Sequence, residues 1–263
     1  MLYMVLHTMK KHINWKLFFI LLGISEVTAF MALPYTLALS PEVAKIFTPT
    51  LIIAQMIQSL VLFAIALFFG LKLAKKVGFG LPILEKILRG EKWQGAFKSI
   101  FGLSIGLGGV AGVLIIVCSL LFYSQSLPFV QLEITIPIWK SLLVSFYGGI
   151  AEEVLLRLFF MTFLVWISWK IKKTPEGKPT TLGIWTAIFV SSILFGLGHL
   201  PVTGNITTIT PMIIARALLL NGIGGVVFGW LYQKKGLESA MISHFSCDIV
   251  IHVIFPLVMS VFV

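Results

Sequence analysis

Long apolar runs constrain this chain more than any other feature of its sequence. Seven runs are long enough to cross a bilayer, which takes about 20 residues of helix. The runs are continuous rather than alternating, which excludes a transmembrane barrel. Only 11% of the residues are charged and the mean hydropathy is +1.02, values that exclude an ordinary soluble enzyme. The runs are residues 17–39, 49–71, 97–123, 137–169, 182–200, 210–232 and 237–263.

These runs predict an all-α fold, a polytopic transmembrane helical bundle of about seven spans, with eight spans as the alternative count. Seven spans use most of the 263 residues and leave no room for a separate soluble domain. We therefore expect one integrated membrane domain. Residues 1–136 would form N-terminal membrane helices with a basic amphipathic loop at 72–98, and residues 137–263 a catalytic helical core.

The basic residues alternate between the connections that join the runs. Sixteen of the 20 lysines and arginines lie in the N-terminal arm and in the second, fourth and sixth connections, whereas the opposite connections hold only Lys45 and Lys140. Lysine and arginine accumulate on the cytoplasmic side of membrane proteins. The sixteen are Lys10, Lys11, Lys16, Lys72, Lys75, Lys76, Lys86, Arg89, Lys92, Lys98, Lys170, Lys172, Lys173, Lys178, Lys234 and Lys235.

This alternation predicts a multi-pass integral membrane protein with a cytoplasmic N-terminus, in a prokaryotic-type plasma membrane. The net charge of +10 then reflects topology and contact with the lipid bilayer, so no nucleic-acid partner is expected. The connection from 72 to 98 mixes aromatic and aliphatic residues with lysine, which is typical of a short interfacial helix. The small-residue segment at 106–112 is expected to allow close helix packing.

Few ionisable residues remain inside the runs, and each costs at least about 2.5–3.5 kcal/mol on insertion scales. A single histidine or a lone Glu–Arg pair is often structural. The convergence of acids, histidines and an arginine on several spans instead favours a functional site. The polar residues inside the runs are Glu26, Gln55, Gln58, Glu152, Glu153, Arg157, His199, Arg216, Asn221, His244, Asp248 and His252.

Helix geometry gives the two adjacent glutamates different surroundings. Glu153 and Arg157 are four residues apart, so they share a helix face and can neutralise each other. Glu152 is rotated by about 100° from Glu153 and gains no local cation. Burial makes a carboxylate more basic, which suits a general base near neutral pH. The sequence therefore favours Glu152 as the catalytic carboxylate and Glu153 with Arg157 as structural support.

Histidines on two other spans could complete a site. His244, Asp248 and His252 are spaced four apart and line one helix face, which must turn toward the bundle interior or toward water. His199 lies near a span end beside Gly196 and Gly198, where backbones can approach closely. Two chemistries stay open at this point. The residues could bind zinc with three protein ligands and one water, or carboxylate and imidazole could activate water directly.

Three motifs in this order resemble the CPBP intramembrane protease family, which includes the type II CAAX prenyl endopeptidases and the bacterial Abi proteins. Glu-Glu-x-x-x-Arg is matched by Glu152, Glu153 and Arg157. Phe-x-x-x-His is matched by Phe195 and His199, and His-x-x-x-Asn/Asp by His244 and Asp248. The resemblance covers residues 137–254.

The resemblance implies a membrane-embedded endopeptidase. In the family's glutamate-type mechanism, Glu152 and His199 would activate the attacking water, and His244 and Asp248 would stabilise the oxyanion. Asp248 occupies a position that is Asn in the prenyl-processing members, and an ionised Asp cannot donate to an oxyanion. Asp248 would then orient His244 or contribute to a metal site. Bacterial members are often called metalloproteases, so the cofactor is either zinc, with Glu152, His199 and His244 as candidate ligands, or none.

The sequence thus predicts an intramembrane endopeptidase that hydrolyses a peptide bond in a membrane-associated peptide or protein. Two alternatives remain. A proton-coupled transporter could use the same buried groups as a proton relay, although the chain shows no internal repeat. A non-catalytic immunity or scaffold protein of the same fold could keep the motifs without the chemistry.

Counted along the predicted helices, the candidate residues do not lie at the same distance from the basic ends of their spans. At 1.5 Å per residue, Glu152 and His199 lie about 25 Å from the basic ends of their spans, whereas His244 lies only about 12 Å from the start of its own. A broken helix or a deep start of the last span would bring them together. A cavity that faces the cytoplasm is expected.

Overall fold

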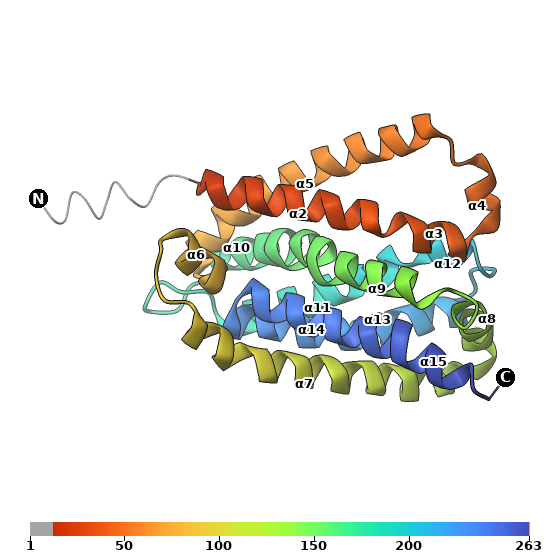
Figure 1. Ribbon diagram of the computed structural model, residues 1–263. Coiled ribbons are helices and arrows are strands. Elements are labelled where there is room, and N and C mark those ends of the chain that lie inside the picture. Colours follow the sequence, from red (N-terminus) through yellow and green to blue (C-terminus); the bar gives the residue numbers. More distant parts are fainter. Residues whose placement is uncertain (1–12, 263) are drawn as a thin grey trace, which may run out of the picture.

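The computed structural model describes residues 13–262, which form a bundle of helices that run roughly along one axis (Figure 1). An isolated antiparallel bridge between Lys173 and Pro179 is the only β contact within these residues. The expected polytopic helical bundle is therefore confirmed. The N-terminal arm with Lys10 and Lys11, on which part of the charge pattern rests, lies outside the described residues.

Six helical segments of the described chain are long and apolar enough to cross a membrane. Four are built from several elements: α2 (Trp15–Met31) with α3 (Leu33–Leu39); α7 (Gln94–Ser119) with η1 (Leu120–Phe122) and α8 (Tyr123–Glu133); α11 (Thr181–Gly198) with the short α12 (Leu200–Gly204); and α14 (Leu237–Asp248) with η4 (Ile249–Ile254) and α15 (Phe255–Met259). The other two are the single helices α5 (Pro49–Val77) and α13 (Pro211–Lys235). Two short helices, α4 (Pro41–Ile46) and α6 (Pro82–Leu88), lie in the connections.

A seventh helical run occupies the middle of the bundle. It joins α9 (Ile138–Tyr147), the π-helical segments η2 (Gly148–Glu152) and η3 (Val154–Met161), and α10 (Thr162–Ile171). It carries Glu152, Glu153 and Arg157 in its middle. Around them, Ala151, Val154 and Leu158 are fully buried by the surrounding helices. Charges are tolerated here because they face protein rather than lipid. Counted with the six apolar segments, this run would give about seven passes, the number that the sequence predicts.

The connections that carry the basic residues meet at one end of the bundle, which we call the basic end. The amide of Leu237 donates to the carbonyl of Gly80 over 3.0 Å, which joins the sixth connection to the second. The ammonium of Lys76 lies 5.9 Å from the ring centroid of Trp166, near the fourth connection. Figure 1 shows α6 and the loop after α10 at this same end, and α4, α8 and α12 at the other. The alternation of charge along the sequence is therefore a segregation of charge in space.

The small residues of α7 allow a close approach to α14. A Cβ on Gly108 would lie 2.1 Å from the carbonyl oxygen of Ser243, and one on Gly112 would lie 3.0 Å from that of Cys247. Neither contact leaves room for a side chain, so the expected role of this segment in helix packing is confirmed. The packing fixes α14, which carries His244 and Asp248, against the bundle.

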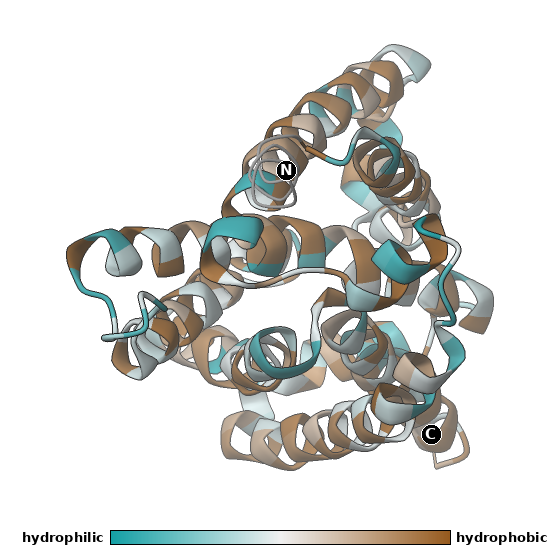
Figure 2. Cartoon of the chain, turned by 90° about the vertical axis from the view of Figure 1, so that its left-hand side faces the viewer, coloured by the Kyte–Doolittle hydropathy of each residue, from teal (hydrophilic) through white to brown (hydrophobic). Residues whose placement is uncertain are grey.

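The outer surface of the bundle is apolar. Large side chains such as Phe19, Val61 and Val110 are more than half exposed, on three different helices. Figure 2, which looks along the bundle from the basic end, shows hydrophobic residues over most of the helices. In water such a surface would be strongly unfavourable, whereas in lipid it costs nothing. The chain is an integral multi-pass membrane protein.

The charge segregation predicts which end a membrane-impermeant thiol reagent reaches. In a variant without its native cysteines (Cys118→Ala, Cys247→Ala), Lys45→Cys should be labelled in intact cells, because it lies exposed at the end opposite the basic end. Lys92→Cys, exposed at the basic end, should react only after the cells are permeabilised. The reverse pattern would invert the predicted orientation.

Candidate active site

A cavity of about 670 Å³ lies inside the bundle, and most of the polar residues identified in the sequence line it, but Gln58, Glu153 and Arg157 do not. Its wall continues through Ser126, Thr203 and Pro256, all at the end opposite the basic end. The cavity thus lies away from the basic end, whereas the sequence predicted a cavity that faces it; the cytoplasmic location of the basic end stays a prediction. The basic end is filled by packed apolar side chains such as Leu71, Leu81 and Leu237. The candidate residues on its wall are Glu152, His199, His244 and Asp248.

The difficulty of depth is resolved by where α14 begins. Helix α6 covers the start of α14. The amides of Ile83 and Leu84 in α6 donate hydrogen bonds of 2.9 Å to the carboxylate of Glu238, the second residue of α14. The helix thus starts inside the bundle rather than at its surface. Its His244 then reaches the level of the central run, where η2 and η3 provide wide π-helical turns on either side of Glu153. Such turns are frequent at functional sites.

Glu153, Arg157 and His244 form a buried charged network. Both Glu153 and Arg157 are fully buried, and their charged groups are 3.4 Å apart. The same Oε1 of Glu153 lies 2.8 Å from Nδ1 of His244, which must donate to it. Arg157 also donates to the carbonyl of Gly225 on α13, at 3.2 Å. The sequence suggested that the pair neutralises itself; the structure adds that Glu153 orients a histidine on another helix.

Aromatic rings hold the imidazole of His244 in place. The ring of Phe228 stacks on it with centroids 4.4 Å apart and an interplanar angle of 20°. The ring of Phe195 meets it edge-on at 5.5 Å. The guanidinium of Arg157 lies over both rings, at 5.1 Å from Phe195 and 5.5 Å from Phe228. The imidazole therefore has one orientation, with Nδ1 toward Glu153 and Nε2 toward the cavity. The role of Phe228 could not be predicted from the sequence, because a phenylalanine in an apolar span is common and does not indicate a contact with a histidine.

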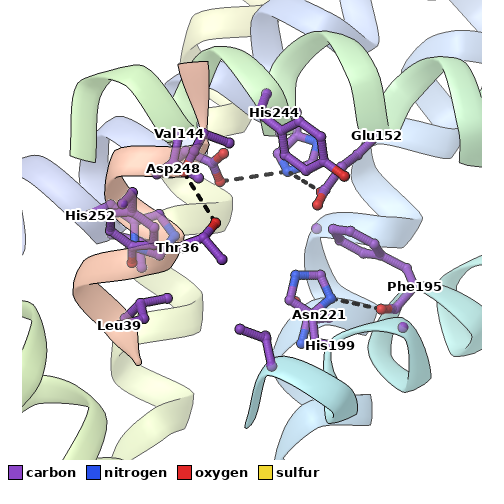
Figure 3. Close-up of a pocket in the computed structure, with 18 of the residues that line it drawn as sticks. Thr36, Leu39, Val144, Glu152, Phe195, His199, Asn221, His244, Asp248 and His252 are labelled. Carbon is purple, nitrogen blue, oxygen red and sulfur yellow. Dashed lines mark hydrogen bonds and ion pairs between the residues drawn. The ribbon is translucent and has the colours of Figure 1, made fainter. Parts of the chain in front are cut away.

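Two further carboxylates approach Nε2 of His244. Glu152 Oε2 lies 3.8 Å away and Asp248 Oδ1 lies 3.6 Å away (Figure 3). This approach depends on Gly148, where a Cβ would lie 2.2 Å from Oδ2 of Asp248 and 3.2 Å from Nε2 of His244. Side chains from two helices thus converge on one imidazole nitrogen at the cavity wall. Glu152, the less buried of the two glutamates, faces the cavity.

His199 lies on another wall of the cavity, next to Asn221 (Figure 3). Its Nδ1 lies 2.8 Å from the carbonyl oxygen of Phe195. A carbonyl oxygen can only accept, so Nδ1 carries the proton, and Nε2 of the neutral ring is left as an acceptor. The ring of Phe195 packs edge-on against His199, with centroids 4.8 Å apart. Phe195 therefore positions both histidines, which gives a physical reason for its place one turn before His199.

A second polar cluster lines the same cavity. Nδ1 of His252 lies 3.0 Å from the carboxylate of Glu133, and the hydroxyl of Tyr35 contacts both of these residues. The cluster ties together α3, α8 and η4. In the sequence, Glu133 lies in a predicted connection and Tyr35 carries no functional signal. Their partners are 98 to 217 residues away in the chain, so no local spacing links them. The carboxylate of Glu26 instead bridges α2 to α5 through Ser59, over 2.8 and 2.9 Å.

A metal site was the alternative chemistry for these residues. Among residues 13–262, no group of three or more His, Cys, Asp or Glu side chains is arranged to hold a metal ion. Of the candidate zinc ligands, Glu152 approaches His244, whereas His199 lies on another wall of the cavity (Figure 3). Because these three side chains do not converge on one point in this arrangement, the chemistry below is derived from the chain's own groups.

The fold and its cavity define a class, that of membrane-embedded helical proteins with carboxylates and imidazoles gathered within the bundle. Residues 134–250 match the family described as type II CAAX prenyl endopeptidase Rce1-like. This match confirms the resemblance of the C-terminal part of the chain to the CPBP intramembrane proteases. No curated protein and no solved structure matches the chain.

The buried network predicts a large loss of stability when Glu153 is neutralised. Glu153→Gln leaves the cation of Arg157 buried without its carboxylate, and breaking a buried pair in this way costs about 3–5 kcal/mol. The midpoint of thermal unfolding in detergent, followed by tryptophan fluorescence, should fall markedly. Glu152→Gln is the matched control, since this neighbouring carboxylate faces the cavity, and its midpoint should change little. Equal midpoints for both variants would contradict the structural role of Glu153.

Proposed function

We propose that this protein is an intramembrane endopeptidase that hydrolyses a peptide bond of a membrane-associated peptide or protein, with water activated by Glu152 and His199. The observation that carries the proposal is the cavity itself. Its walls carry a carboxylate without a tight partner, Glu152, and across the cavity an imidazole with a free acceptor nitrogen, His199. The match of residues 134–250 to a protease family supports hydrolysis over transport or a scaffold role.

In this mechanism, a water molecule in the cavity is deprotonated as it attacks the scissile carbonyl carbon. Glu152 accepts the proton, since its carboxylate faces the cavity and its nearest cationic partner is 3.8 Å away. His199 offers Nε2 as a second acceptor that orients the water. The proton held by Glu152 is then passed to the leaving amine, so that each product receives one hydrogen of the water. Water exclusion by the apolar cavity walls strengthens each of these interactions.

Stabilisation of the oxyanion falls to His244 in this proposal. When Glu153 holds Nδ1–H, the protonated ring directs Nε2–H toward the cavity. A negative charge that develops on the carbonyl oxygen would be stabilised there. Asp248 accepts rather than donates when it is ionised, and we propose that it orients His244 and balances its charge. This assignment gives a physical reason for an Asp at this position.

The substrate is expected to reach the site from the half of the membrane away from the basic end. The cavity lies in that half of the bundle, and its walls there are lined by apolar residues such as Leu39, Ile52 and Ile206. With the basic end in the cytoplasm, this is the outer half. A peptide that is anchored in or near the outer leaflet would then be within reach.

Removal of the Glu152 carboxylate tests the proposed function. The protein in liposomes should cleave members of a pool of N-acylated, internally quenched decapeptides with randomised central residues. Glu152→Gln should lower kcat by about 10²–10⁴-fold, the usual contribution of a general base, without a change in thermal midpoint. Glu26→Gln, a carboxylate bound to Ser59, should retain activity.

Two results would contradict this chemistry. Full activity of Glu152→Gln would remove Glu152 from the reaction. Loss of activity on treatment with a chelator, and its recovery with zinc, would replace direct activation of water by a metal-dependent mechanism. We expect the chelator to have no effect.

The close contact at Gly148 makes a second, independent prediction. Gly148→Ala should displace the carboxylate of Asp248 by about 1 Å, and a misplacement of this size can cost 10²-fold in rate. Gly109→Ala is the control, since a Cβ at that glycine meets nothing within 4 Å. Both variants should fold, and peptidase activity should fall only in Gly148→Ala. Equal activities would show that the Asp248–His244 geometry does not matter to the reaction.

A further inference from the structure

Three lysines surround two neighbouring tryptophans at the basic end of the bundle, where α5 and α10 end. The ammonium groups of Lys76 and Lys170 lie 5.9 and 5.8 Å from the ring centroid of Trp166. Lys170 also lies 5.6 Å from the ring centroid of Trp169, and Lys173 lies over that ring at 4.3 Å. We call Lys76, Lys170 and Lys173 the lysine cluster. Its residues are separate from those that line the cavity of the candidate active site.

The loop after α10 is folded so that Lys173 stays at this place. The indole Nε1 of Trp169 donates to the carbonyl of Gly177 over 2.8 Å. The amide of Thr174 donates to the carbonyl of Lys178 over 2.9 Å, which closes the loop on itself. The loop therefore lies against Trp169 rather than extending into water. Because Lys173 is already positioned, a ligand of the cluster would bind without a large cost for ordering the loop.

The lysine cluster carries three positive charges that the chain does not balance. Its three side chains are exposed. Within residues 13–262, no carboxylate forms an ion pair with a lysine of the cluster. Glu176, the acid of the same loop, instead interacts with Thr174 and Lys178. Like charges held close together repel one another, so an anionic ligand would stabilise the cluster.

Exposed apolar side chains continue from the lysine cluster toward the middle of the bundle. Phe69 precedes Lys76 by seven residues on α5, and Phe163 precedes Lys170 by seven residues on α10, so each pair shares a helix face. The two phenylalanines are 46% and 36% exposed. The ring of Phe163 stacks on that of Trp166, with centroids 6.2 Å apart. An apolar strip thus begins where the cations end, an arrangement that matches a phospholipid with its charged headgroup and apolar chains.

We propose that the lysine cluster binds the headgroup of an anionic phospholipid whose acyl chains lie along Phe69 and Phe163. Lysine is a good partner for phosphate, and basic pockets between spanning helices are suited to anionic headgroups. The apolar strip favours a lipid over a free anion, which would leave that strip unused. A choline headgroup fits poorly, because lysine ammonium groups already occupy the ring positions where its quaternary ammonium would bind.

Bound in this way, the lipid would join α5 to the central helical run. Lys76 belongs to α5, whereas Lys170 ends the run that carries Glu152, Glu153 and Arg157. A ligand that binds only the folded protein stabilises it. We therefore expect an anionic phospholipid to raise the stability of the bundle through a site far from the reaction itself.

The test compares two lipids bound by the full-length protein in nanodiscs that contain equal amounts of phosphatidylglycerol and phosphatidylcholine. After release into the gas phase, native mass spectrometry counts the lipids that the protein retains. Wild-type protein should retain phosphatidylglycerol over phosphatidylcholine by about ten-fold or more, since each lysine near the membrane surface adds to the attraction for an anionic lipid. The ratio should fall toward one in the triple variant Lys76→Gln, Lys170→Gln, Lys173→Gln.

Two matched variants separate the cluster from the overall charge of the basic end. Arginine at all three cluster positions should keep the wild-type ratio, because the charge remains. The triple variant Lys92→Gln, Lys98→Gln, Lys235→Gln removes the same charge from exposed positions elsewhere at this end, and it should also keep the ratio. The single change Lys170→Gln should lower the ratio in part, and it decides where the triple cluster variant fails to fold.

Thermal unfolding gives a second measurement. The midpoint of wild-type protein should rise when phosphatidylglycerol replaces phosphatidylcholine, and this rise should be absent from the triple cluster variant. Inorganic phosphate at millimolar concentration should not reproduce it.

Four results would overturn the proposal. They are a wild-type ratio near one, a ratio that the cluster variants leave unchanged, an equal loss in the variant of Lys92, Lys98 and Lys235, and equal stabilisation by inorganic phosphate. The third would assign the preference to the charge of the whole surface, and the fourth would assign the cluster to a free anion.

Discussion

The contact of Glu153 with Arg157 and with His244, which lie on different elements, is the constraint on which the rest of the site depends. One buried carboxylate oxygen faces both Arg157 and Nδ1 of His244, at 3.4 and 2.8 Å. Buried charges are expensive unless they are paired, so this geometry can exist only in a well-packed bundle. It locks α14 to the central helical run. It also sets the direction in which Nε2 of His244 points.

The arrangement of the side chains around His244 depends on these contacts of Glu153. Because the orientation of the imidazole of His244 is fixed, the rings of Phe228 and Phe195 can pack against it. Glu152 and Asp248 approach its other nitrogen, Nε2. Glycines permit these approaches: Gly148 admits Asp248, and Gly108 lets α7 come close to α14. The catalytic proposal thus rests on packing as much as on the chemistry of the side chains.

Local patterns predicted much of this structure. Continuous apolar runs gave the seven passes, and the alternation of lysines gave their grouping at two ends, because bilayer thickness and charge act on each segment separately. The spacing of Glu152, Glu153 and Arg157 separated the two glutamates, because adjacent residues on a helix cannot share a face. These local patterns did not predict how far His244 lies from the basic end of the bundle. This distance depends on α6, which covers the start of α14 and binds Glu238 through backbone amides.

By itself, the sequence determined the membrane class, the spans and the short set of ionisable residues that the bilayer tolerates, since these follow from the free energy of transfer of each segment. Only the tertiary structure decided which of those residues meet. It placed His244 rather than His199 beside Glu152, joined His252 to Glu133 and Tyr35, and opened the cavity toward the end opposite the basic connections. These contacts join residues about 90 to more than 200 positions apart in the chain. They depend on how whole helices pack, which no local spacing records.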